Sequence, residues 1–186
     1  MKGKRTGVEF QDHVLTVKRC DCTVMYHLKK PDTICDNVKF INTNGILAVT
    51  GDYGNWIFCR EFHPSKDGRV SDHYWCEKLQ NSSTQKPYEF DGEATRQEID
   101  EMLRDDEELT IEEKDYLLEC KDQSHESEFW YNSYAHGNLP NGRDHEFPPC
   151  EEKITEWLQV VFDAYEEICR RLHRQPELGE SQKEAG

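Results

Sequence analysis

The sequence has no long apolar run. None of its hydrophobic stretches approaches the roughly 20 residues that a membrane-spanning helix needs. The basic N-terminus MKGKRTGVEF has no apolar segment behind it, so it does not have the pattern of a secretory signal. We therefore expect a cytoplasmic protein without a membrane partner.

Positive charge is also scarce. The chain has 23 Lys and Arg against 38 Asp and Glu, a net charge of −15. Residues 89–128 hold 17 acidic residues against four basic ones, or −13, so the other 146 residues carry only −2. Binding to nucleic acid through phosphate neutralisation needs a basic surface. The composition therefore argues against direct nucleic-acid binding and favours a basic partner.

The known catalytic motifs are missing. There is no glycine-rich nucleophile elbow, phosphate-binding loop or His-Glu-x2-His helix. His63, His73 and Cys76 could supply a nucleophile and a base. However, Cys76 follows Tyr74 and Trp75, which favours core packing. We expect no enzyme and no cofactor, with an enzyme as the minority alternative.

The eight cysteines lack the spacing of a metal site or of a small disulfide-rich domain. Cys20, Cys22 and Cys35, with His13 and His27, are the candidates for zinc. Zinc sites usually pair their ligands as Cys-x2-Cys or His-x3-His, whereas Cys-x-Cys on a strand does not converge without a loop. In a reducing compartment we expect free thiols in or near the core, and no metal.

Aromatic residues are plentiful, with four Trp, eight Tyr and eight Phe, and each can bury a large apolar area. Five segments rich in β-formers follow one another at 8–18, 22–28, 37–43, 45–50 and 55–62. Asn44-Gly45 is a strong hairpin signal. Asp52-Tyr53-Gly54 predicts a second turn, in which Gly54 takes a positive φ and Asp52 caps the turn. Consecutive hairpins predict an antiparallel meander.

The second half of the chain is helical. Segment 93–106 predicts a helix with Ile99, Met102 and Leu103 on one face, and segment 111–121 predicts a second helix. Thr110 and Glu113 have the spacing of a capping box at the start of that second helix. YWCEKL (74–79) fits a short helix or a strand, and 80–87 reads as a polar connector.

The last element is the clearest helix. From residue 150 to 174, apolar residues recur at three- and four-residue spacing, at Ile154, Trp157, Leu158, Val161, Tyr165, Ile168, Cys169 and Leu172. We therefore predict an α+β fold: an N-terminal antiparallel β-meander of four to five strands packed against a long C-terminal amphipathic helix, with two acidic helices between. Residues 1–175 would form a single domain and residues 176–186 a flexible tail.

The acidic helices carry the leading candidate surface. Its proposed partner-binding residues are Asp100, Glu101, Asp105, Asp106, Glu107, Glu108, Glu112 and Glu113. Such a surface can imitate the phosphates of a nucleic acid and occupy a basic groove. The alternative is a solvated face that only keeps the protein soluble.

A second candidate surface is the aromatic segment at 129–145. Trp130, Tyr131, Tyr134, His136 and Arg143 could stack on and neutralise a nucleotide. The alternative is that the same aromatic residues pack against the sheet.

Several of these segments together resemble a group of small phage- and prophage-encoded proteins of uncharacterised function. The likeness rests on ILAVTGDYGNWIFCREF (46–62), KPYEFDGEATRQEI (86–99), the aromatic FWY segment and the C-terminal helix, and spans roughly residues 35–172. Segment 63–72 and the acids at 105–108 depart from it. The resemblance implies no catalytic residues. It does imply an accessory protein that binds a host protein, for example an inhibitor of a host defence nuclease of the anti-CRISPR or anti-restriction kind.

Overall fold

The computed structural model describes residues 6–64, 70–82, 86–124 and 149–174. The chain forms two compact units, residues 1–87 with 154–186 (unit 1) and residues 88–153 (unit 2). The expectation of a single domain over 1–175 stays a prediction. Its boundary with the tail at 176 lies outside the described residues.

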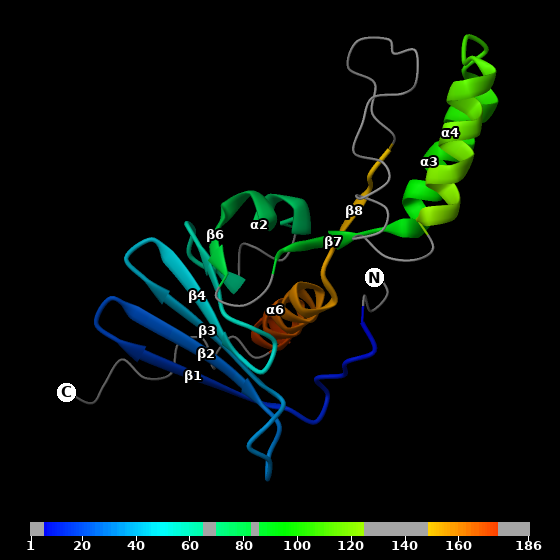
Figure 1. The fold of residues 1–186 in the computed structure, drawn as a ribbon. Helices are drawn as coiled ribbons and strands as arrows, with labels where there is room; N and C mark the ends of the chain where they lie inside the picture. Colours follow the sequence, from blue (N-terminus) through cyan, green and yellow to red (C-terminus); the bar gives the residue numbers. More distant parts are fainter. Residues whose placement is uncertain (1–5, 65–69, 83–85, 125–148, 175–186) are drawn as a thin grey trace. The chain divides into compact units, whose positions relative to one another are not determined.

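Unit 1 is built on a six-stranded antiparallel sheet in which each strand pairs with the next one along the chain (Figure 1). The strands are β1 (Val14–Cys20), β2 (Thr23–Lys29), β3 (Asn37–Thr43), β4 (Ile46–Gly51), β5 (Trp56–Phe58) and β6 (Leu79–Ser82). This meander confirms the predicted fold class. It contains one strand more than expected. The sequence did not predict β6, because its residues LQNS do not alternate between apolar and polar as strand residues usually do.

The two predicted hairpin turns are present. Asn44 and Gly45 have φ values of 49° and 82°, and Gly54 has 91°. Asp52 acts differently from the prediction, because its Oδ2 accepts hydrogen bonds from the backbone N and Nδ2 of Asn37, at 2.8 and 2.7 Å. It therefore ties the β4–β5 turn to the start of β3.

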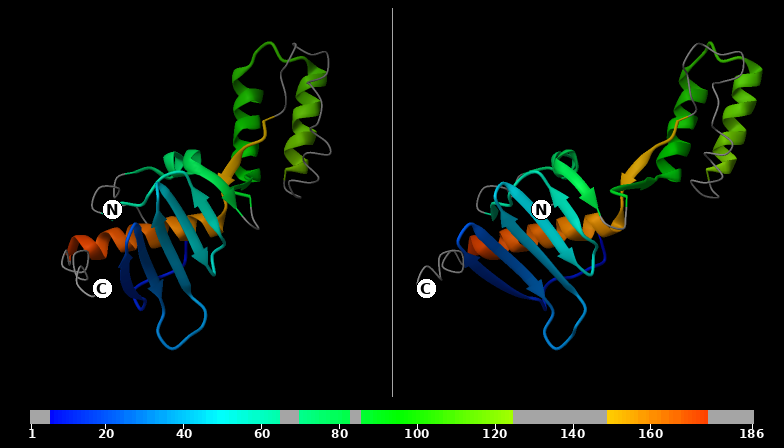
Figure 2. Two further views of the ribbon diagram at one scale, coloured as in Figure 1. Left: turned by 90° about the vertical axis from the view of Figure 1, so that its left-hand side faces the viewer. Right: turned by 60° about the vertical axis from the view of Figure 1, so that its left-hand side comes forward.

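Helix α6 (Glu156–Arg174) lies across one face of the sheet and contacts β2 (Figure 2). Alternate strand residues point toward it and are buried, as period-two alternation requires. The core on this side includes Tyr26, Leu28, Val38, Phe40, Leu47, Val49, Trp56 and Phe58 from the strands and Leu158, Val161, Phe162, Tyr165 and Ile168 from the helix. This burial confirms that the C-terminal helix is amphipathic and covers the sheet.

Two element boundaries differ from the prediction. The first strand begins at Val14 rather than at residue 8, because a turn precedes it in which His13 N donates to Phe10 O at 3.1 Å. The last helix begins at Glu156 rather than at residue 150. Residues Glu152–Ile154 form strand β8, which pairs with β7 (Tyr88–Phe90).

A short helix, α2 (Asp72–Lys78), resolves the open choice at 74–79. Ser71 caps it by accepting a hydrogen bond from Tyr74 N at 3.3 Å. Its Trp75 is buried and meets Phe58 and Tyr165 edge to face, with ring centroids 5.5 and 5.4 Å away. The helix therefore adds to the same core that α6 covers.

No described helix of unit 1 covers the opposite face of the sheet (Figures 1 and 2). The strand register places one row of side chains across all six strands of this open face: Lys18, Met25, Ile41, Ala48, Ile57 and Asn81. Of these, Ile57 is 41% exposed.

Candidate functional site

Unit 2 contains the acidic hairpin, formed by α3 (Gly92–Asp105), the connector at 106–110 and α4 (Ile111–Gln123). Asp91 caps α3, because its Oδ1 accepts from the backbone N of Glu93 and of Ala94, both at 3.2 Å. Thr110 and Glu113 form the predicted capping box at the start of α4.

The apolar side of the hairpin holds the two helices together. Ile99, Leu109, Leu117 and Cys120 form a buried cluster, with Met102, Leu103 and Tyr116 packed against it. On α3, the residues that the helical periodicity predicts to share one face, Ile99, Met102 and Leu103, all lie in or against this cluster. Burial raises the pKa of the Cys120 thiol to about 11, so this cysteine is a packing residue rather than a reactive thiolate.

The acidic residues predicted to bind a partner lie on the outer side of this hairpin. Six are exposed: Asp100, Glu101, Asp105, Glu107, Glu108 and Glu112. Asp106 is half-buried, and its Oδ1 accepts from Glu108 N at 2.9 Å. We call Asp105, Asp106, Glu107 and Glu108 the tip carboxylates, because they lie at and next to the connector where the chain reverses.

Basic side chains offset little of this charge. Lys121 Nζ lies 2.6 Å from Asp100 Oδ1, and Arg104 Nε lies 3.0 Å from Asp105 Oδ1. The hydrogen bond with Asp105 raises the pKa of Arg104. Exposed pairs of this kind contribute little to stability. The hairpin therefore holds far more acidic than basic side chains, and this concentrates negative charge on it.

Glu113 differs from the other predicted contact residues. It is 3% exposed, and its Oε2 accepts from Thr110 N at 2.7 Å. Its carboxylate is therefore occupied in capping α4. The sequence contains this capping signal, so the prediction of Glu113 as a contact residue is wrong in physical terms: its carboxylate faces the helix end. The hairpin also has exposed acids outside the predicted contact residues: Glu93, Glu98, Asp115, Glu119 and Asp122.

The aromatic residues predicted as a ligand site, Trp130, Tyr131, Tyr134, His136 and Arg143, lie outside the described residues. Nucleotide binding by this segment stays a prediction. The candidate base residues each lie beside a carboxylate: His63 Nε2 is 3.8 Å from Glu61, and His73 Nε2 is 3.4 Å from Glu77. Across the described ranges, no group of three or more His, Cys, Asp or Glu could hold a metal ion.

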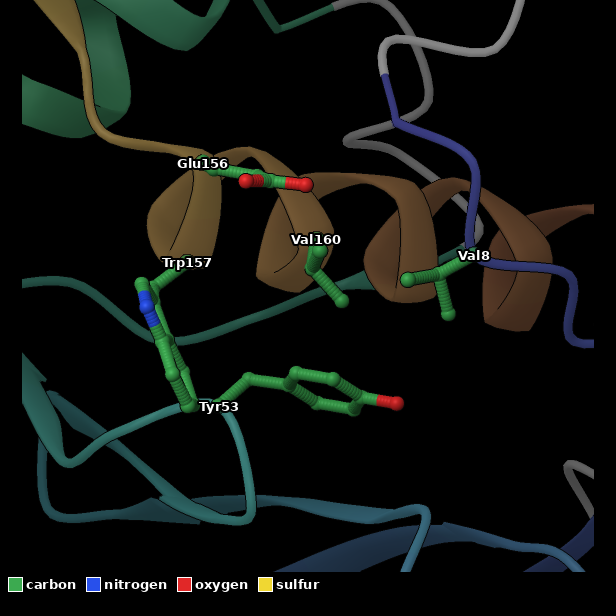
Figure 3. Close-up of a pocket in the computed structure, with 5 residues that line it drawn as sticks. All are labelled: Val8, Tyr53, Glu156, Trp157 and Val160. Carbon is green, nitrogen blue, oxygen red and sulfur yellow. The ribbon is translucent and has the colours of Figure 1, made fainter.

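A small open pocket in unit 1 was not expected from the sequence. It has a volume of about 210 Å³ and is lined by Val8, Tyr53, Glu156, Trp157 and Val160 (Figure 3). Tyr53 comes from the β4–β5 turn, and its ring centroid lies 6.3 Å from that of Trp157. Burial, and then the charges of Asp36 and Asp52, raise the pKa of Tyr53.

Helical periodicity does not predict this pocket, because of the position of Trp157. Its spacing matches the apolar face of α6, yet it is 45% exposed because it lies in the first turn of the helix, beside Tyr53 rather than over the strands. Helical periodicity alone does not distinguish these two positions.

Comparison with known proteins finds no matching family model, curated protein or solved structure. Within the part of the chain that the structure describes, no helix is both long enough and apolar enough to cross a bilayer.

Proposed function

We propose that this chain is a phage-type accessory protein that binds a host protein with a basic surface, using the acidic hairpin as its contact. The observation that carries the proposal is the exposure of Asp105, Glu107 and Glu108 at the tip, together with the exposed contact acids Asp100, Glu101 and Glu112 on α3 and α4. Carboxylates gathered on a two-helix hairpin suit a concave basic site.

The core of the hairpin is apolar, and its caps use Asp91, Thr110 and Glu113. Among the tip carboxylates, Asp106 has a local structural contact, because its Oδ1 accepts from Glu108 N at 2.9 Å. Neighbouring like charges at 105–108 repel one another and so oppose folding. The concentration of these charges at the tip despite that cost supports a role in recognition.

A nucleic-acid-binding site is the class of partner that this surface fits best. Such sites hold Lys and Arg spaced to neutralise phosphates, and carboxylates on a helix can meet the same cations. Occupying that site excludes DNA or RNA. We therefore propose inhibition of a host defence nuclease, as anti-CRISPR and anti-restriction proteins achieve, without chemistry by this chain.

Cleavage assays with purified RNA-guided and restriction nucleases test this proposal. The wild-type chain is added to each nuclease, and the fraction of a linear double-stranded DNA that is cut is measured. We expect inhibition that competes with DNA, because both occupy the same basic site. Asp105→Asn/Glu107→Gln/Glu108→Gln (the tip variant) should raise the concentration for half-inhibition at least about tenfold, which corresponds to about 1.4 kcal/mol.

A matched control separates local recognition from total charge. Asp12→Asn/Asp32→Asn/Glu77→Gln (the charge control) removes the same three negative charges at exposed positions of unit 1. It should inhibit as the wild type does. If both variants inhibit the nuclease equally less than the wild type does, only net charge matters. If neither variant changes the inhibition, the tip of the hairpin is not the contact.

A further inference from the structure

The open face of the sheet is basic, although the chain as a whole is strongly acidic. Its charged strand residues are Lys18, Lys29 and Lys39, and no Asp or Glu stands among the strand residues that face this side. His27 lies among these lysines, directly opposite Lys39 in the β2–β3 register. Burial, and then the charges of Lys39, Lys29 and Lys18, lower the pKa of His27.

An apolar band crosses this basic surface. Met25, Ile41, Ala48 and Ile57 occupy adjacent strands, with Lys18 at one end of their row. Val14 and Ile46 on the same face are 54% and 43% exposed. A partly exposed apolar band with cations beside it suits an amphipathic helix that carries carboxylates beside its apolar residues.

The outer face of α4 has that pattern. Ile111 is 80% exposed and Leu118 is 47% exposed, and their seven-residue spacing places them on one side of the helix. Asp115 lies between them, and Glu119 follows Leu118; both acids are exposed. These apolar side chains point away from the buried cluster that joins α4 to α3.

The spacings of the two surfaces agree. Ile111 and Leu118 are separated by about 10 Å along the helix axis, from a rise of ~1.5 Å per residue. Ile41 and Ile57 stand two strands apart, which is also about 10 Å at ~4.8 Å per strand. A helix laid across the strands can thus place both apolar residues on the band with its carboxylates over the lysines.

We propose that the open face of the sheet in one copy of this chain binds the outer face of α4 in a second copy. The charges are opposite and the apolar residues match in spacing. Ile111 and Leu118 on α4 are exposed, and the band on the sheet combines exposed Ile57 with half-buried Met25, Ile41 and Ala48. Single-stranded nucleic acid is the weaker candidate for this face. Its bases bind by stacking on aromatic side chains, and the row across the six strands contains no aromatic residue.

Sedimentation equilibrium of the full chain over a range of concentrations tests the proposal. We expect an average mass that rises above the 21.9 kDa of one copy as concentration increases, and that falls again as salt is added. Lys18→Glu/Lys39→Glu (the face variant) and Asp115→Lys/Glu119→Lys (the helix variant) should each sediment as a single copy, because each places like charges on both surfaces.

Mixing the two variants gives the decisive result. In an equimolar mixture, the acidic face of one variant meets the lysines on α4 of the other, and the unchanged pair of surfaces still fits. The mixture should therefore regain the higher mass that each variant alone has lost. Glu93→Lys/Glu98→Lys on α3, at two exposed acids outside the predicted contact residues, makes the same charge change as the helix variant and should self-associate like the wild type.

Three outcomes overturn the proposal. The first is a wild-type chain with the mass of one copy at every concentration. The second is self-association that neither variant weakens, or that the mixture fails to restore. The third is a single-copy chain that binds a single-stranded DNA oligonucleotide and loses this binding in the face variant, which would assign the face to nucleic acid. None of these variants changes the tip carboxylates, so nuclease inhibition is tested separately.

Discussion

At the scale of single residues, the buried side chain of Asn42 holds the segment at Phe62 against the sheet. Asn42 is 4% exposed, and its amide satisfies both backbone groups of Phe62: Nδ2 donates to Phe62 O at 2.5 Å, and Oδ1 accepts from Phe62 N at 2.7 Å. Phe62 in turn packs against Tyr26, Phe40 and Tyr165. One amide therefore fixes a central ring of the core.

Asn42→Ala should lower the free energy of unfolding by on the order of 2–4 kcal/mol, because it leaves a buried donor and a buried acceptor without partners. Urea denaturation of the two proteins measures this difference. Asn81→Ala, at an exposed position of β6, should change stability by less than about 0.5 kcal/mol. A similarly small loss for Asn42→Ala would show that the amide is dispensable.

His13 gives the stability a pH dependence. The residue is 5% exposed, and both of its ring nitrogens lack a hydrogen-bond partner. The ring centroid of Phe10 lies 4.9 Å from that of His13. Burial is the largest cause that lowers the pKa of His13, and Arg171 and Lys30 lower it further, while Asp36 acts against them. The folded chain therefore binds a proton at His13 less readily than the unfolded chain does.

This difference predicts a loss of stability in acid. As pH falls below the unfolded value of about 6.5, the unfolded state takes up the proton first. Stability should then decline until the lowered folded pKa is reached, and level off below it. Urea denaturation between pH 8 and pH 5 should show a shallower decline in His13→Phe than in the wild type. Parallel curves for the two proteins would remove His13 from the effect.

At the scale of elements, turns and caps were the most predictable features. Asn44-Gly45 and the Thr110–Glu113 capping box follow from local chemistry, and the structure contains both. Helix bounds were less predictable, because Glu152–Ile154 pairs with a strand about 60 positions earlier in the chain. The open basic face depends on strand register, and the pocket beside Trp157 depends on the approach of the β4–β5 turn to α6. Both join residues that are distant in sequence. Local patterns do not contain that information.

Gly51 shows a constraint that the turn signal did not reveal. Its φ is 143°, and a Cβ at this position would lie 2.2 Å from the backbone O of Asn37. Gly51→Ala should therefore cost about 3 kcal/mol or more in unfolding free energy. Gly45 also has a positive φ, of 82°, but a Cβ there meets nothing within 4 Å. Gly45→Ala should cost only about 1–2 kcal/mol, and equal losses at both positions would contradict the clash.

The capping box separates structural from contact acids within the hairpin. Thr110→Ala removes the acceptor of Glu113 N and should destabilise the protein by about 1 kcal/mol. Glu113→Gln keeps a side-chain oxygen for Thr110 N, so stability and partner binding should both stay close to wild type. Thermal melts and the nuclease assay measure the two effects. A large loss of inhibition in Glu113→Gln at unchanged stability would return Glu113 to the contact surface.

At the scale of the whole molecule, charge is separated along the chain. Residues 89–128 carry nearly all of the net charge, while the strands of unit 1 present lysines on their open face. The charge of the sequence segments identified the acidic hairpin. It did not identify the basic face, because that face consists of every second residue of several strands and no single segment is basic. A net charge of −15 therefore describes neither surface.

The central claim is that the tip carboxylates recognise a basic nucleic-acid-binding protein. Immobilised wild type, tip variant and charge control, each incubated with the same bacterial extract, test it most directly through mass spectrometry of the bound proteins. We expect the wild type and the charge control to retain the same nucleic-acid-binding protein, which added double-stranded DNA releases, and the tip variant to lose it. Equal retention by all three, or retention that DNA leaves unchanged, would contradict the claim.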